Sequence, residues 1–237
     1  MKKILALVLL IAVCAISYSQ DLNAELDKIK TNLNTLPFKY TVEDGSLKFQ
    51  KIYEMPMNIS KDQLYYIAKD YIIKSYGDAN RVIQLDDKEA GKITVKGLYA
   101  DIYCDCGDLV FIGSAMSYTA THILQIDLKD NRVRITITVT QIKQKSGGTG
   151  TGFSYIPLKY LDFSPTDFYP FRNDCMVWSC NHDGGWFPKE GSIKQYKGNY
   201  HEGMIIYNTA FRANATIEAL YNAFTTQKQV GSTSDDW

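Results

Sequence analysis

The chain has 237 residues, 45% of them hydrophobic, so it is long enough for one large or two small domains with a real core. Its 26 basic and 26 acidic side chains give a formal net charge of +0, which removes any bulk electrostatic reason to bind nucleic acid or an anionic membrane. Aromatic residues make up 13% of the chain, which is ample material for a core or for an exposed binding surface.

The start of the chain, residues 1–19, is typical of a secretory signal peptide. Two lysines precede an apolar run, residues 4–13, that is too short to span a bilayer. Serines stand at the third and the last position before Gln20, as a cleavage site requires. We therefore expect an exported protein, periplasmic or secreted, with no transmembrane segment after signal removal. A lipoprotein anchored through Cys14 is the disfavoured alternative, because Val13 is larger than the residue that lipoprotein processing needs before the cysteine.

Residues 20–46 are predicted to form a short amphipathic helix or a tether. Leucine and isoleucine recur at helical spacing over residues 21–36, and Pro37 ends the pattern. Asp44-Gly45 then signals a turn. The main domain is expected to begin at residue 47.

A strand and a helix are the best-specified elements of the chain. The run Phe49–Met55 is strand-like. Ser60 followed three residues later by Gln63 makes a capping box, which is the signature of a helix start. One apolar stripe follows at helical spacing: Leu64, Ile67, Ala68, Tyr71 and Ile72. We expect Ile67 and Ile72 to be buried against a sheet.

Alternating residues predict that an antiparallel sheet follows. Strands are expected at Arg81–Leu85 and Lys92–Leu98, joined by a turn over residues 86–91. A long hairpin, Tyr118–Lys143, turns at Asp130-Asn131. One face of the hairpin is apolar: Ala120, His122, Leu124, Ile126, Leu128, Val133, Ile135, Ile137 and Val139. The other face is polar apart from Ile123: Thr121, Gln125, Asp127, Arg132, Arg134, Thr136, Thr138 and Thr140. This pattern predicts a sheet that is covered on one side only.

Two segments interrupt the pattern and are predicted to be insertions. The first, at about 99–117, is expected to be an inserted hairpin or a long connection. The second, at about 146–202, starts with a glycine-rich hinge and is crowded with aromatic residues, prolines and cysteines without a period. A helix is expected from about Asn208 to Gln227, and the main domain ends at about residue 228. The stripe of this helix is Ala210, Ala213, Asn214, Ile217, Leu220, Tyr221 and Phe224. Residues 229–237 are expected to be a disordered tail.

Four stretches of the chain are distinctive. They are Glu54-Met55 at a strand end, Ser60–Tyr65 at a helix start, the turn Val82–Gly91, and Lys129–Arg134 in the long hairpin. Together they resemble the family called domain of unknown function 4468, over residues 49–143, whereas the two insertions do not fit it. The resemblance implies a TBP-like fold and no catalytic residue, because no activity is established for the family. A DNA partner does not follow from the shape of a fold.

The element order independently predicts an α+β fold. A strand, a helix, two strands, a long hairpin and a final helix would place two helices on one face of a curved antiparallel sheet. An irregular cysteine- and aromatic-rich insertion would be added to this TBP-like core.

Four cysteines remain after signal removal, and export makes disulfides their expected state. They are Cys104, Cys106, Cys175 and Cys180. A bridge within Cys104-Asp-Cys106 would be strained, so cross-pairing of the first two with the last two is favoured. A zinc site that recruits His182 is the alternative, although the C-x-C spacing lies outside the range usual for structural zinc.

No catalytic residue, cofactor or metal ligand is predicted. His122 is in phase with the buried face of its strand and is expected to be a core or rim residue. His182-Asp183 could be half of an acid–base pair, but a turn rich in Asn, Asp and Gly explains this dipeptide equally well. His201 lies nearby in the sequence. The acidic turn at residues 86–89 lacks the spacing of a calcium loop.

An exported binding or scaffold module without enzymatic activity is the function that the sequence favours. Its candidate partner-binding residues are Trp178 and Trp186 in the second insertion, and Arg132 and Arg134 near the hairpin tip. The tryptophans equally fit a small satellite core. The expected partner is an envelope protein or a glycan, not nucleic acid. The alternative function is an envelope hydrolase with its site in residues 153–202.

We predict that the exported protein has no free thiol. Cross-links between the two pairs of cysteines would close loops of about 70 residues and stabilise the folded state by roughly 2–4 kcal/mol. A thiol reagent should therefore label the unfolded, unreduced protein at no cysteine, and should label it fully after reduction. Reactive thiols together with bound zinc would instead establish the metal site.

Overall fold

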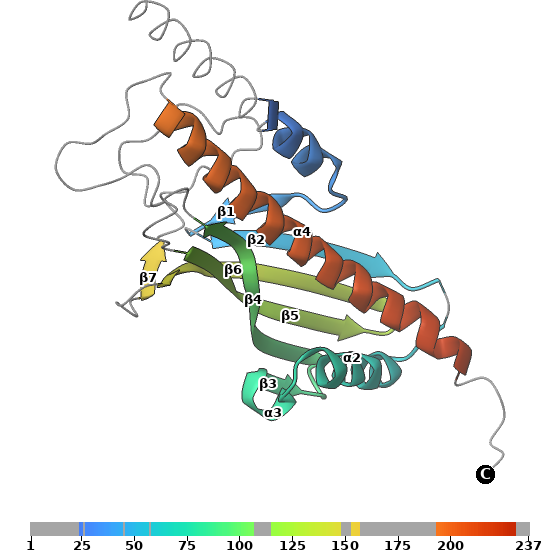
Figure 1. Ribbon diagram of the computed structural model, residues 1–237. Coiled ribbons are helices and arrows are strands. Elements are labelled where there is room, and N and C mark those ends of the chain that lie inside the picture. Colours follow the sequence, from blue (N-terminus) through green and yellow to red (C-terminus); the bar gives the residue numbers. More distant parts are fainter. Residues whose placement is uncertain are drawn as a thin grey trace, which may run out of the picture.

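The computed structural model describes residues 24–25, 27–44, 46–56, 58–106, 115–147, 153–156 and 193–230. They form one antiparallel sheet with two long helices on one of its faces (Figure 1). A helical segment lies where the sequence predicted a helix or a tether, and it buries Ile29 and Leu33. The predicted signal peptide lies outside the described residues. Within them, no helix combines the length and the apolar character needed to cross a membrane.

The sheet has the strand order β1-β2-β6-β5-β4-β3, and β7 pairs with the outer part of β6. Every pairing is antiparallel. The strands are β1 (Tyr40–Glu43), β2 (Ser46–Glu54), β3 (Ile83–Asp87), β4 (Lys92–Cys106), β5 (Ala115–Lys129), β6 (Arg132–Gly147) and β7 (Phe153–Ile156). The antiparallel sheet with helices on one side confirms the predicted α+β class. The cysteine-rich part of the second predicted insertion lies outside the described residues.

Helix α2 (Lys61–Ser75) begins with the predicted capping box. The Ser60 hydroxyl accepts a bond from the Gln63 amide at 3.3 Å, and the Gln63 side chain accepts one from the Ser60 amide at 3.0 Å. Its buried stripe is Leu64, Tyr65, Ala68 and Ile72. The prediction is confirmed for Ile72 and is wrong for Ile67, which is only half-buried. The helix is rotated so that Tyr65 faces the sheet, where its hydroxyl donates to Asp86.

The turn between β5 and β6 holds the start of α2. The Asn131 side chain accepts a bond from the Ile59 amide at 2.7 Å, and the Asn131 amide donates to the Ile59 carbonyl at 3.0 Å. Asp130 accepts a bond from the Lys61 amide at 2.7 Å, which places a carboxylate at the positive end of the helix. Asn131 has a φ of 58°, which asparagine tolerates better than most residues. The predicted turn therefore also caps the helix from outside.

The turn between β3 and β4 is attached to the same end of the sheet. The Leu128 amide donates to the Gly91 carbonyl at 2.7 Å, and the Lys61 side chain donates to the Glu89 carbonyl at 2.7 Å. Gly91 has a φ of 64°, and a Cβ there would overlap the Leu128 carbonyl oxygen. Only glycine meets both conditions at this position.

Helix α4 (Ile193–Val230) crosses the sheet next to α2 (Figure 1). All the apolar residues predicted for its stripe are buried or half-buried. The predicted start near Asn208 is wrong, because the helix begins at Ile193 within the segment predicted to be irregular. Asn214 is buried and bonds to both backbone groups of Phe38, accepting at 2.8 Å and donating at 3.0 Å. This pair fastens the segment before β1 to α4.

The first predicted insertion is the outer half of a hairpin. Strand β4 continues from Lys92 through Tyr99 to Cys106 and pairs with β5, which begins at Ala115. The register shifts between Tyr99 and Tyr103, where Asp101 has a φ of 47°. Because of this irregularity and the sequence Cys-Asp-Cys, the sequence pattern did not predict the outer half of β4.

Three smaller elements also differ from the predictions. The expected strand at Arg81 starts with a short helix, α3 (Ala79–Val82), before β3. The predicted tether holds strand β1, which pairs with β2. Strand β6 extends into the predicted hinge as far as Gly147, and β7 pairs back onto it.

Replacement of Ile72 by Ala should destabilise the fold by about 2–5 kcal/mol, because the Ile72 side chain is 0% exposed and the cavity would not refill. Ile73→Ala is the matched control, since Ile73 is 58% exposed on the same helix and should lose no more than about 0.5 kcal/mol. Urea unfolding followed by circular dichroism measures both. Equal losses would contradict the placement of α2.

Candidate functional site

The two faces of the sheet differ in their covering and in their chemistry. Helices α2 and α4 pack on the apolar face. The other face, which we call the open face, has neither helix on it (Figure 1). Its side chains come from alternate positions of the central strands: Gln50 and Ile52 on β2, Arg134 and Thr136 on β6, Gln125 and Asp127 on β5, Lys96 and Leu98 on β4.

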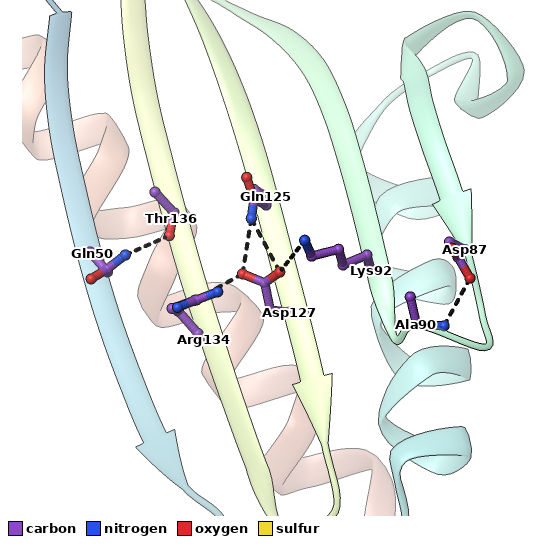
Figure 2. A network of polar contacts seen from close by, with 8 residues as sticks. All are labelled: Gln50, Asp87, Ala90, Lys92, Gln125, Asp127, Arg134 and Thr136. Carbon is purple, nitrogen blue, oxygen red and sulfur yellow. Dashed lines mark hydrogen bonds and ion pairs between the residues drawn. The ribbon is translucent and has the colours of Figure 1, made fainter. Parts of the chain in front are cut away.

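A polar network lies on the open face near the hairpin tip (Figure 2). Asp127 is opposite Lys92 on one side and Arg134 on the other in the strand register. It accepts a bond from the Arg134 Nε at 2.9 Å, and its two oxygens accept bonds from Gln125 at 3.1 Å and 3.0 Å. The Lys92 ammonium lies 3.9 Å away. The carboxylate thus holds Arg134 in one position.

The second predicted arginine lies next to this network. The Arg132 Nε contacts Glu54 at 2.9 Å, again across directly paired positions. Arg132, Arg134 and Asp127 line a hollow of about 170 Å³, together with Ile52 and Lys129. We call it the tip hollow. The structure therefore brings both predicted arginines together at one place on the open face.

The other end of the open face carries two adjoining hollows, which we call the lysine hollows. One has a volume of about 300 Å³ and the other about 390 Å³, and they share Leu98 and Lys143. The first also contains Lys96 and the second contains Lys145. The sequence analysis did not single out these lysines. For Lys96, its alternation with buried residues on β4 was the available signal.

His122 lies on the helix-covered face and is not accessible as a catalytic base. It is 1% exposed, its Nε2 lies 3.1 Å from the Tyr76 hydroxyl, and its ring stacks on Tyr99 at 3.9 Å. Gly97 is directly opposite, where a Cβ would come within 2.6 Å of the His122 ring. The prediction of a core or rim histidine is confirmed.

Among the described residues, neither the acidic turn at residues 86–89 nor the cysteines form a candidate active centre. Asp86 is bonded to Tyr65 and Lys69, and Asp87 accepts a bond from the Ala90 amide at 2.8 Å (Figure 2). In the described ranges, His, Cys, Asp and Glu residues form no group of three or more that could hold a metal ion.

The remaining predicted site residues lie largely outside the described part of the chain. Cys104 is exposed on β4, but Cys175 and Cys180 are outside, so the disulfides stay a prediction. Trp178, Trp186, His182 and Asp183 are outside as well. His201 is within α4, where only its backbone is described.

Residues 49–143 match a family model described as a domain of unknown function (DUF4468) with TBP-like fold. Residues 49–143 thus match DUF4468. This confirms the resemblance that the sequence predicted. In the DUF4468 domain, two of the four distinctive stretches are the turns that hold α2 to the sheet, and a third is the capping box of α2.

Two solved structures are similar to this chain. One is described as a TBP-like protein from Parabacteroides distasonis, with 13% identity, a TM-score of 0.45, and coverage of 77% of this chain and 95% of that one. The other is a DUF4468 family protein from Bacteroides ovatus, with 13% identity, a TM-score of 0.45, and coverage of 78% and 90%. No curated protein matches the sequence.

His122 should make the fold sensitive to acid. Burial lowers the pKa of His122 to about 4, from an ordinary value of 6.5. The unfolded chain therefore takes up this proton at a higher pH than the folded chain, and stability falls as the pH drops from about 6.5 to about 4. The difference corresponds to on the order of 3 kcal/mol.

Urea unfolding of the wild type and of His122→Gln at several pH values tests this effect. The two proteins share every other ionisable group, so the difference between them isolates His122. The stability advantage of the wild type should shrink as the pH falls through this window. Parallel curves would contradict the assignment.

Proposed function

We propose that this protein is a non-enzymatic binding or scaffold module that docks a partner on the open face of its sheet. The observation that carries the proposal is the tip hollow, where Arg132 and Arg134 are held in place by carboxylates on the face without helices. We also propose that it acts in the bacterial envelope after export, on the strength of the signal-like residues 1–19.

The arginines of the tip hollow suit a binding role. A guanidinium has five N–H donors, and the recorded ion pairs use the Nε–H, so donors stay available for a partner. Because Asp127, which is itself held by Gln125, already orders the Arg134 side chain, binding costs less conformational entropy there. Arginines in such positions are enriched among residues that dominate binding energy.

The burial and the hydrogen bonds of the described acid–base groups favour a binding role over a catalytic one. His122 is beneath the helices, and Asp86 and Asp87 are bonded within their own turn and to α2. On the open face, Asp127 bonds to Arg134 and Gln125, which keeps it from accepting a proton from a substrate.

Partner capture from envelope extract with the mature protein as bait tests the proposal. Arg132→Gln removes an exposed ion pair on the open face, and Lys74→Gln removes an exposed ion pair on α2. Neither should change stability by more than about 1 kcal/mol, because both pairs are exposed. Arg132→Gln should weaken the captured complex at least about tenfold, and Lys74→Gln should not. Equal capture by both variants and the wild type would refute the open face as the docking surface.

A further inference from the structure

We infer that the tip hollow binds a carboxylate side chain from an extended acidic segment of a partner protein, and that Lys129 holds this carboxylate together with Arg132. The inference rests on the proposed function, because it takes the open face as the docking surface, and it adds the chemistry of the partner. It also assigns a binding role to Lys129, which the sequence analysis did not name as a binding residue.

Lys129 and Arg132 form a like-charged pair at the hairpin tip. They are directly opposite each other across β5 and β6, and both line the tip hollow. The other directly paired charged residues of the described sheet have opposite signs: Asp87 with Lys92, Lys92 with Asp127, Asp127 with Arg134, and Glu54 with Arg132. Opposite charges across a strand pair stabilise a sheet, and like charges destabilise it. The pair at the tip therefore departs from the rule that the rest of the sheet follows.

Lys129 has no counter-charge of its own in the described part of the protein. No described residue makes an ion pair or a hydrogen bond with its side chain. The carboxylate of Asp130, its neighbour in the chain, bonds instead to the first amide of α2. Glu54 approaches Arg132 from the side away from Lys129, because β2 and β5 flank β6 on opposite sides. A carboxylate bound between Lys129 and Arg132 would replace their repulsion by two attractions.

The donors in the hollow suit a carboxylate. An ammonium has three N–H donors and a guanidinium has five, of which the ion pair of Arg132 uses the Nε–H. Arg134, two residues along β6, brings a second guanidinium to the hollow, and Asp127 keeps it in place. Hydrogen bonds between ionised groups are roughly twice as strong as those between neutral groups. A carboxylate in the hollow can therefore accept strong bonds from Lys129 and Arg132 at once.

The size of the hollow limits how much of a ligand enters it. Its volume of about 170 Å³ lies below the range of about 300–1,000 Å³ that is usual for small-molecule pockets. One side-chain group fits there, and the rest of the ligand must lie along the open face, which neither helix covers. Ile52 lines the same hollow and is 42% exposed, so it can contact the methylene groups of a glutamate. The hollow therefore fits one acidic side chain of a longer chain.

The mixed charges around the hollow favour a polypeptide over a uniformly charged polymer. Asp127 and Glu54 lie beside the cations and would repel a continuous row of phosphates. The formal net charge of +0 adds no general attraction to nucleic acid. A polypeptide can place single carboxylates: in an extended chain, alternate side chains lie on one side roughly 7 Å apart, which is also the spacing of Arg132 and Arg134 along β6. We therefore expect alternate acidic residues in the partner.

Fluorescence anisotropy with the purified protein tests the inference. The probe is a short, end-capped, fluorescein-labelled peptide in which glutamate alternates with serine. Its controls are the same peptide with glutamine in place of glutamate, and an oligomer of galacturonic acid measured by competition. The glutamate peptide should bind with a dissociation constant below about 100 µM, at least about tenfold tighter than either control. Failure to bind, or equal binding of the glutamine peptide, would overturn the inference. Equal or tighter binding of the oligosaccharide would overturn the assignment to a polypeptide.

Matched variants separate the hollow from net charge. Lys129→Gln should weaken binding of the glutamate peptide at least about fivefold. Lys96→Gln removes the same charge from an exposed position of the open face outside the tip hollow. Lys96 is opposite Ile123, roughly 20 Å from Lys129 along β5, so its loss should leave the affinity within about twofold. Equal losses in the two variants would mean non-specific attraction and would overturn the site.

A stability measurement separates a binding role of Lys129 from a structural one. Because Lys129 faces Arg132 without a counter-charge, Lys129→Gln should leave the free energy of unfolding unchanged or raise it, while it weakens peptide binding. Urea unfolding without peptide measures this effect. A variant that loses both stability and peptide affinity would overturn the assignment of Lys129 as a binding residue.

The inference and the proposed function can fail separately. If the peptide does not bind while capture still depends on Arg132, this inference falls and the proposed function stands. If the peptide binds through Lys129 while capture does not depend on Arg132, the carboxylate site stands and docking of the envelope partner on the open face is refuted.

Discussion

The hydrogen bonds between the β5–β6 turn and the start of α2 are the contact on which the rest of this structure depends. Asn131 satisfies both backbone groups of Ile59, and Asp130 bonds to the first amide of the helix. Helix starts leave several amides without partners, so a turn that supplies acceptors sets where the helix begins. The same turn starts β6, which places Arg132 and Arg134 opposite Glu54 and Asp127. One short stretch thus positions a helix on one face and a charged network on the other.

The two faces of the sheet differ in their covering and in their side chains as a result. On the covered face, α2 and α4 pack against the central strands, and Asn214 fastens the segment before β1 to α4. On the open face, charged side chains near the tip pair with one another, and Lys96 and Lys143 lie toward the other end, beside Leu98. A rigid sheet with one face buried keeps the spacing of side chains on the other face constant, which is what a preorganised binding surface needs.

Local patterns were enough to predict much of the fold. Ser60 and Gln63 marked the start of α2, and the alternation around Asp130-Asn131 predicted the long hairpin and its polar face, because these signals act within a few residues. The early turns of α4 were missed, since Gly198 and the mixed polar residues around it weaken the helical period. Strand β4 was cut short at Tyr99 because Asp101 adopts a left-handed conformation that breaks the alternation.

The sequence by itself determined the types of the main elements, the family resemblance and the sidedness of the long hairpin, since each follows from the spacing of neighbouring residues. It placed Arg132 and Arg134 on one polar face for the same reason. Only the tertiary structure decided that Lys96 and Lys143 line one hollow with Thr121, because strand order and register bring together residues that are distant in the chain. The extra residue of β6 near Thr140 changes the phase of the strand, so Ile142 faces the helices while Lys143 faces outward. A bulge of this kind depends on pairing with β5, and no periodicity within β6 alone encodes it.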